Sequence, residues 1–201
     1  INFDEFGFLL DDVIKMQLRF DVDGCLFLSG GVDSSIIAAH LERNWNKEKI
    51  PAFSLNGEKN GYGEFHLAQN VSNKISNINL IPINYDHNII TENIKPVLFH
   101  SDQPHGDFSF FLIRELCKAA HNEGVIVAFN GDGPDEILAG FHHNQEFLLS
   151  QTRTNFSLIE YFNRICYMSE ISRKKLLNDD FRQSLQNPVE FFESILSDSR
   201  D

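Results

Sequence analysis

Apolar residues follow two alternating patterns along the chain. Short apolar runs, typical of buried strands, occur at residues 24–28, 51–55, 78–83 and 125–129. Between them, apolar positions spaced three or four residues apart predict helices over residues 6–20, 33–46, 64–76, 86–100 and 108–122. Strands that alternate with helices predict an α/β fold, a parallel sheet with helices on both faces. Pro82 lies in the third run and predicts an edge position or a strand end there.

Residues 141–201 keep the helical spacing of apolar positions and contain no run typical of a strand. We therefore expect a helical C-terminal segment after the sheet. The apolar stripes of this segment are interpreted as core positions.

A glycine-rich loop follows the first predicted strand. Residues 29–35 read Ser-Gly-Gly-Val-Asp-Ser-Ser, and a helix is predicted to begin near Asp33. Glycines allow a sharp turn, and successive backbone N–H groups together with a helix N-terminus favour an anion. No lysine follows the glycines, so the loop differs from the Walker A pattern. We interpret it as a phosphate-binding loop; the alternative is an ordinary Gly-rich strand-to-helix turn.

A second loop, Asn130 to Gly140, follows the fourth predicted strand and carries several carboxylates. Ligands of open parallel sheets bind at the carboxyl ends of the strands, so both loops are expected to face one ligand. Carboxylates beside a polyphosphate repel it unless a divalent cation lies between them. Asp33 and Asp135 are the candidates to share Mg²⁺, which prefers carboxylate and phosphate oxygens. The alternative for the second loop is a helix N-terminus whose acidic residues favour the helix dipole.

The charge and composition of the chain limit the classes of binding partner that we expect. The net charge is −12, from 17 basic and 29 acidic residues, which disfavours nucleic acid and favours a small-molecule partner. We find neither a signal peptide nor an apolar run of about 18 residues, so we expect a cytoplasmic protein without a membrane partner. The three scattered cysteines, Cys25, Cys117 and Cys166, are expected to be buried thiols.

Several motifs, taken in order, resemble the synthetase domain of the asparagine synthetases, which are PP-loop ATP pyrophosphatases. They lie at residues 9–13, 19–22, 27–39, 51–55, 64–71, 102–109 and 131–141. The resemblance implies a Rossmann-like fold of the adenine nucleotide alpha hydrolase type, in a single ATP-binding domain over residues 1–201. Its nucleotide-binding core would span about residues 8–143 and a helical extension about residues 144–201. We find neither the family's N-terminal glutaminase domain nor its late lysine-bearing C-terminal segment in this sequence.

The resemblance also implies a reaction. A substrate carboxylate, expected to be that of aspartate, attacks the α-phosphate of ATP and pyrophosphate leaves. Ammonia, free or from a glutaminase domain, then converts the acyl-adenylate into an amide and AMP. The implied cofactors are ATP and Mg²⁺, with the metal held by Asp33 and Asp135. The residues expected to contact the nucleotide are Leu28, Ser29, Gly30, Gly31, Asp33, Ser34, Ser35, Leu55 and Gly131.

Asp132 takes the place where the asparagine synthetases often have glutamate, and it is expected to orient or deprotonate the incoming ammonia. Two alternatives to asparagine synthesis stay open. One is a related adenylating synthetase, such as a β-lactam or peptide cyclase. The other is a nucleotide-binding module without turnover, which the presence of both Asp33 and Asp135 disfavours.

Overall fold

The computed structural model describes residues 2–57, 63–86, 88–102 and 107–150, together with residues 160–161, 172, 175–178 and 180. The chain divides into two compact units, residues 1–132 and residues 133–201. The first unit holds the sheet, and the second begins with two helices, α6 (Pro134–Leu138) and α7 (His142–Ser150). The single domain expected over residues 1–201 stays a prediction.

The sheet of the first unit contains four parallel strands. They are β1 (Gly24–Phe27), β2 (Ile50–Asn56), β3 (Ile78–Asn84) and β4 (Val127–Phe129), in the order β3-β2-β1-β4. Leu26 of β1 stands between Ala52 of β2 and Phe129 of β4. Pro82 lies on the edge strand β3, which confirms the expectation from its missing N–H.

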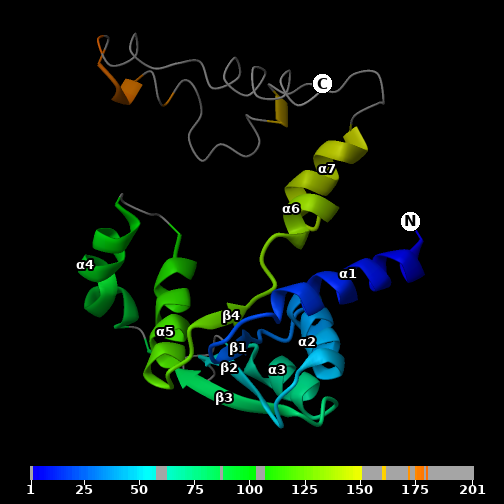
Figure 1. Cartoon of the computed structure of the whole chain (residues 1–201). Helices are drawn as coiled ribbons and strands as arrows, with labels where there is room; N and C mark the ends of the chain where they lie inside the picture. The colour runs from blue at the N-terminus through cyan, green and yellow to red at the C-terminus, as the bar shows by residue number, and fades with distance from the viewer. Residues whose placement is uncertain are drawn as a thin grey trace. The chain divides into compact units, whose positions relative to one another are not determined.

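Helices cover both faces of this sheet, as the alternating pattern predicts (Figure 1). On one face, Leu26 and Leu28 pack in a core with residues of α1 (Phe3–Gln17), α2 (Val32–Asn44) and α3 (Phe65–Ser72). On the other face, Cys25 and Phe53 pack against Leu116 and Ala120 of α5 (Ser109–Asn122). A further helix, α4 (Ile89–Ser101), contacts α5 through Val97 and Phe111. The α/β fold class is therefore confirmed.

Element ends differ from the predicted ones by a few residues, for local reasons. Helix α1 begins at Phe3 rather than residue 6, because the Asn2 side chain accepts the N–H groups of Asp4 and Glu5 at 3.1 and 3.3 Å. Strand β4 begins at Val127 rather than residue 125, because the N–H of Val125 donates to the Ala120 carbonyl at 2.9 Å.

Helices α3 and α2 end before their predicted last residues. Helix α3 ends at Ser72, four residues before the predicted end at residue 76, and turns lead from Asn73 to β3. Helix α2 ends at Asn44, where Trp45 turns into an extended conformation and places its ring edge-on to Phe20. Much of the predicted C-terminal helical segment lies outside the described residues. None of the helices in the described part of the chain is long and apolar enough to cross a membrane.

Candidate nucleotide-binding site

The strand order places the two glycine-rich loops next to each other. The chain runs from β1 to β2 and β3 on one side of the sheet, while β4 pairs with β1 on the other side. The order therefore reverses between β1 and β4. Crevices outside the carboxyl ends of strands at such a reversal are where α/β sheets bind ligands.

Hydroxyl groups hold the loop after β1 in a fixed conformation. The Ser34 hydroxyl, at the start of α2, lies 3.0 Å from Ser29 Oγ, accepts the Gly30 N–H at 3.2 Å and donates to the Gly31 carbonyl at 3.3 Å. Ser29 Oγ accepts the Gly31 N–H at 3.2 Å. No side chain among the described residues caps the first turn of α2. The N–H groups of that turn are thus left for a ligand.

Gly30 has the left-handed backbone that a sharp turn requires, and it also lies against α3. Its φ of +85° is unfavourable for a side chain, and a Cβ here would lie 2.6 Å from Leu67 Cβ and would overlap the backbone of Leu67 and Ala68. The missing side chain therefore lets the loop touch the backbone of α3.

Gly131 joins the loop after β4 to the first turn of α2. A Cβ at Gly131 would lie 2.8 Å from the Ser34 backbone nitrogen and 3.1 Å from Asp33 Cβ. Its neighbour Asp132 is exposed, and its carboxylate accepts the Asn130 side-chain amide at 2.8 Å. The close approach of Gly131 to Ser34 and Asp33 thus brings Asp132 next to the loop after β1.

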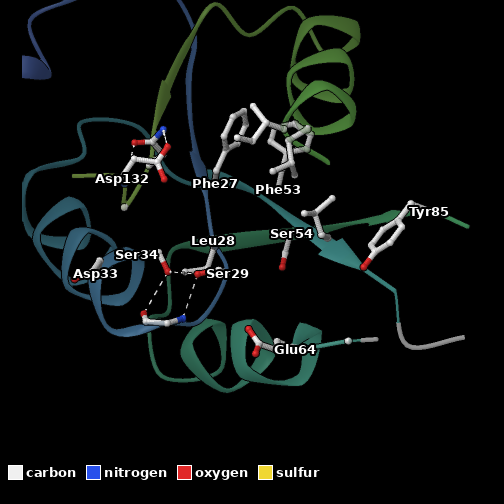
Figure 2. Close-up of a pocket in the computed structure, with 17 residues that line it drawn as sticks. Phe27, Leu28, Ser29, Asp33, Ser34, Phe53, Ser54, Glu64, Tyr85 and Asp132 are labelled. Atoms are coloured by element: carbon white, nitrogen blue, oxygen red, sulfur yellow. Dashed lines mark hydrogen bonds between the residues drawn. The ribbon is translucent and has the colours of Figure 1, made fainter. Parts of the chain in front are cut away.

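A cavity of about 530 Å³ opens where these segments meet, a size usual for small-molecule sites (Figure 2). Its polar lining includes the carboxylates of Asp33, Glu64 and Asp132, and its apolar lining comes from β1, β2 and α5. The full lining is Phe27, Leu28, Ser29, Gly31, Asp33, Ser34, Phe53, Ser54, Leu55, Gly63, Glu64, Tyr85, Ile113, Leu116, Asn130, Gly131 and Asp132.

Most of the residues expected to contact the nucleotide line this cavity: Leu28, Ser29, Gly31, Asp33, Ser34, Leu55 and Gly131, with the expected catalytic Asp132 beside them. Gly30 packs against α3 instead. The Ser35 hydroxyl donates to the Gly31 carbonyl at 2.6 Å and lies outside the lining. Asp135 belongs to the second unit, so its pairing with Asp33 stays a prediction.

Sequence reasoning did not place the remaining lining residues in the site. Phe27 and Phe53 belong to apolar runs that indicate only core packing. Tyr85 follows the edge strand and stands at the end of the cavity (Figure 2). Ser54 had one usable signal, because it is the polar residue of the run at residues 51–55.

The donor set of the cavity suits a hard cation bound together with phosphate. Asp33 supplies carboxylate oxygens, and Mg²⁺ usually takes one or two carboxylates and completes its shell with phosphate oxygens and water. Within the described ranges, no group of three or more His, Cys, Asp or Glu side chains gathers to hold a metal on its own. The cavity therefore fits a metal that arrives with a nucleotide better than a preformed metal centre.

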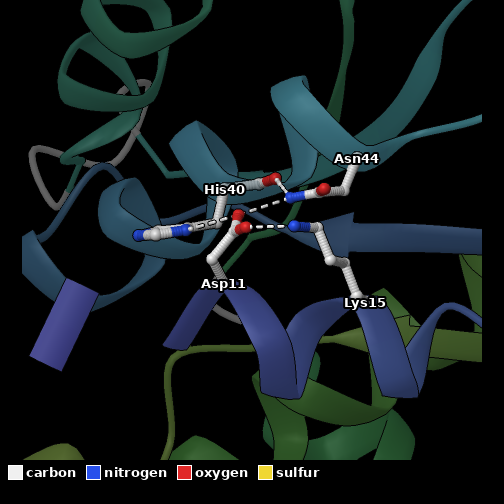
Figure 3. Close-up of polar contacts among 4 residues, drawn as sticks. All are labelled: Asp11, Lys15, His40 and Asn44. Carbon is white, nitrogen blue, oxygen red and sulfur yellow. Dashed lines mark hydrogen bonds and ion pairs between the residues drawn. The ribbon is translucent and has the colours of Figure 1, made fainter. Parts of the chain in front are cut away.

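A polar cluster away from the cavity ties α1 to α2 (Figure 3). The Asp11 carboxylate accepts from Lys15 at 2.6 Å and from the Asn44 side chain at 2.7 Å, and it lies 3.3 Å from His40 Nδ1. Hydrogen bonds from these partners, of which the one from Lys15 has the largest effect, hold the pKa of Asp11 well below its ordinary value. His40 is thus engaged in a structural contact, in agreement with its position at the edge of the apolar stripe of α2.

The described cysteines are not poised for nucleophilic chemistry. Cys25 is buried in β1, and this burial raises the pKa of its thiol to about 12. The expectation of burial is wrong for Cys117, which is exposed on α5, although partial desolvation still raises its pKa. Cys166 lies outside the described residues.

Comparison with known proteins identifies the family. The sequence profile described as "Asparagine synthase" matches residues 5–198. The chain belongs to the asparagine synthase family. The match to this family extends well beyond residue 143, where the motifs recognised in the sequence end.

The curated relatives that this chain matches are much longer than the chain itself. A Methanocaldococcus jannaschii protein, named among the glutamine-hydrolyzing asparagine synthetases, is 29% identical over 95% of this chain and 38% of its own length. Amidase chyE of Penicillium rubens is 28% identical over 70% of this chain and 23% of its own length. Among solved structures, an NH3-dependent NAD synthetase from Campylobacter jejuni aligns with a TM-score of 0.46 at 14% identity, over 70% of this chain and 61% of that chain.

Proposed function

We propose that the cavity binds Mg-ATP and that the chain activates a substrate carboxylate as an acyl-adenylate for amide formation. The observation that carries the proposal is the convergence of two loops on one cavity. The loop after β1, which serine hydroxyls hold by hydrogen bonds, and the Gly131–Asp132 segment after β4 meet at the reversal of strand order. Membership of the asparagine synthase family supports an ATP-dependent carbon–nitrogen ligase.

The reaction has two steps. A carboxylate oxygen of the acceptor, for which we propose aspartate, bonds to the α-phosphorus of ATP, and the bond from that phosphorus to the bridging oxygen of pyrophosphate breaks. Ammonia then attacks the acyl carbon, the bond to the AMP oxygen breaks, and the nitrogen loses a proton. The ammonia is free or is delivered by a glutaminase domain. The protein contributes mainly by positioning reactants and by stabilising charge.

The loop after β1 is proposed to hold the leaving pyrophosphate. The Ser29 and Ser34 hydroxyls line the cavity, and the first-turn N–H groups of α2 favour a negative charge. Gly30, Gly31 and Ser35 set the shape of this loop through the contacts described above. Leu28, Leu55 and Gly131 are proposed to border the adenosine.

Two acidic functions complete the proposal. Asp33 and Asp135 are proposed to hold one Mg²⁺, which would offset the charge of the polyphosphate. Asp132, which lines the cavity and is exposed, is proposed to orient ammonia or to take its proton.

Pyrophosphate–ATP exchange tests the first step directly, because it reports reversible adenylation without requiring ammonia. The chain is assayed with Mg-ATP and a panel of carboxylates that includes aspartate, β-amino acids and peptides. Asp33→Asn is expected to lower exchange about a hundredfold, as for other lost electrostatic contacts at reacting phosphates. The matched control is Asp12→Asn, since Asp12 is exposed on α1 and outside the cavity.

Exchange that depends on aspartate would support the full proposal, whereas exchange only with another carboxylate would keep the adenylation and replace the acceptor. Binding of Mg-ATP with no exchange for any acceptor would favour a nucleotide-binding module. Absence of Mg-ATP binding in calorimetry would refute the proposal as a whole.

A further inference from the structure

Ser54 is the polar residue of β2 that lines the cavity, and its hydroxyl is open to that cavity. It lies near the end of β2 with 2% of its surface exposed, and it lines the cavity. Its side chain makes no hydrogen bond with any other described residue. The described buried side-chain atoms without a partner are Asn77 Oδ1 and Asn144 Oδ1, and Ser54 is not one of them. The Ser54 hydroxyl instead faces the cavity, where a ligand group can replace water as its hydrogen-bond partner.

The sheet register fixes where that ligand group lies. Phe27 of β1 is level with Phe53 of β2, and the Leu28 N–H donates to the Phe53 carbonyl at 2.9 Å. Ser54 is consequently level with Leu28, one residue before the phosphate-binding loop begins. Because neighbouring strands lie about 4.8 Å apart, Ser54 lies close to the start of the phosphate-binding loop.

Glu64 stands on the same side of the cavity, at the N-terminal end of α3. Figure 2 shows the Ser54 hydroxyl pointing from β2 toward the α3 side of the cavity, where Glu64 lies. The contact of Gly30 with Leu67 and Ala68 holds this end of α3 against the phosphate-binding loop. A carboxylate so near the phosphates repels them, so its favourable partner is a neutral hydrogen-bond donor.

We infer that Ser54 and Glu64 bind the ribose hydroxyls of the nucleotide and make the site selective for ribonucleotides; this inference rests on the proposed function. A carboxylate is a pure acceptor that can take both hydroxyls of a ribose, and a serine hydroxyl adds a donor and an acceptor. The same pairing of a carboxylate with a ribose hydroxyl is used at the carboxyl ends of strands in dinucleotide-binding sheets.

Deoxynucleotides test the inference, because they remove the hydroxyl and leave the phosphates and base. Calorimetry gives the Kd of the full chain for Mg-ATP, Mg-2′-deoxy-ATP and Mg-3′-deoxy-ATP. The chain should bind ATP about tenfold more tightly than at least one deoxynucleotide, as expected for a lost hydrogen bond to a charged group. Glu64→Gln and Ser54→Ala should each weaken ATP binding and leave the affinity for that deoxynucleotide unchanged.

The controls are Glu48→Gln and Ser76→Ala, two exposed positions outside the cavity, which should keep the preference of the unaltered chain. Equal losses for ATP and the deoxynucleotides would overturn the inference, since the two residues would then only shape the cavity. Unchanged nucleotide affinities with a raised KM for the acceptor in the exchange assay would also overturn it and assign the pair to the acceptor's ammonium group. A chain that binds no Mg-ATP at all would overturn the proposed function as well. Glu64 is exposed, so Glu64→Gln tests the inference even if Ser54→Ala does not fold.

Discussion

Three glycine-to-alanine changes separate the two energetic costs of a side chain at Gly30, which are an unfavourable φ and a steric overlap with α3. Gly30 combines a positive φ of +85° with a close approach to the α3 backbone. Gly124, in the turn after α5, has a positive φ of +76° and no heavy atom within 4 Å of an added Cβ. Gly31 has a φ of −66° and only an ordinary contact, with Ser29 Oγ at 3.4 Å. An alanine would therefore meet both costs at Gly30, only the unfavourable φ at Gly124, and neither cost at Gly31.

The expected magnitudes differ enough to be measured. A positive φ costs an alanine about 1–2 kcal/mol, so Gly124→Ala should lower the free energy of unfolding by about that amount. Overpacking against a backbone that cannot move aside adds about 1–3 kcal/mol, so Gly30→Ala should cost about 2–5 kcal/mol. Gly31→Ala should be neutral or should stabilise by about 0.5 kcal/mol, because alanine restricts the unfolded chain.

Trp45 makes the assay specific to the first unit. It is the single tryptophan of the chain, and its ring packs edge-on against Phe20 at a centroid distance of 6.4 Å. Urea titrations followed by tryptophan fluorescence thus report the unfolding of the unit that holds the site. A loss for Gly30→Ala no larger than that for Gly124→Ala would refute the close contact between the phosphate-binding loop and α3. A large loss for Gly31→Ala would refute the assignment of the costs to φ and packing.

Three further outcomes follow from the site and its surroundings. The stabilisation from Asp11 should be full above its ordinary pKa of 3.8 and should fade as the pH falls toward its lower folded pKa. The difference in unfolding free energy between the unaltered chain and Asp11→Asn, from the same fluorescence titrations, should therefore shrink from pH 7 to pH 3. A constant difference would contradict the polar cluster. Iodoacetamide at pH 8 should label Cys117 in the folded chain and Cys25 only after unfolding, because burial raises the pKa of Cys25 to about 12; peptide mass mapping would show the order. Asp33→Asn and Asp135→Asn should each weaken Mg-ATP binding in calorimetry, with a double variant that is less than additive, whereas full additivity would show that the two carboxylates serve different ions.

Features that depend on neighbouring residues in the sequence were predictable. The apolar runs and the helical spacing predicted the four strands and the helices of the first unit, because each pattern records which face of an element is buried. Pro82 predicted the edge strand through a property of its own backbone. The ends were less accurate, since they depend on single contacts, such as the cap that Asn2 provides and the bond from Val125 to Ala120.

In the candidate site as well, residues marked by a local sequence pattern were predictable and those that depend on distant contacts were not. Ser29, Asp33 and Asp132 follow strand ends in the sequence, and the rule that ligands bind at the carboxyl ends of strands predicted that they meet. The place of Ser54 and Glu64 in the cavity depends on the register between β1 and β2 and on the packing of α3, and the one local signal is the polar side chain of Ser54 within an apolar run. The contact of Gly30 with α3 could not be predicted for the same reason, because its close neighbour is the backbone of a helix more than 30 residues later in the chain.

Gly131 shows how the strand order turns two separate motifs into one site. Since β4 pairs directly with β1, the loops that follow these strands leave the same edge of the sheet side by side. A side chain at residue 131 would stand 2.8 Å from the Ser34 nitrogen and would cover one of the N–H groups that the first turn of α2 offers to a ligand. Glycine there both permits the loops to touch and keeps that donor open. The contact between the motifs, rather than either motif alone, therefore sets how a phosphate can bind between them.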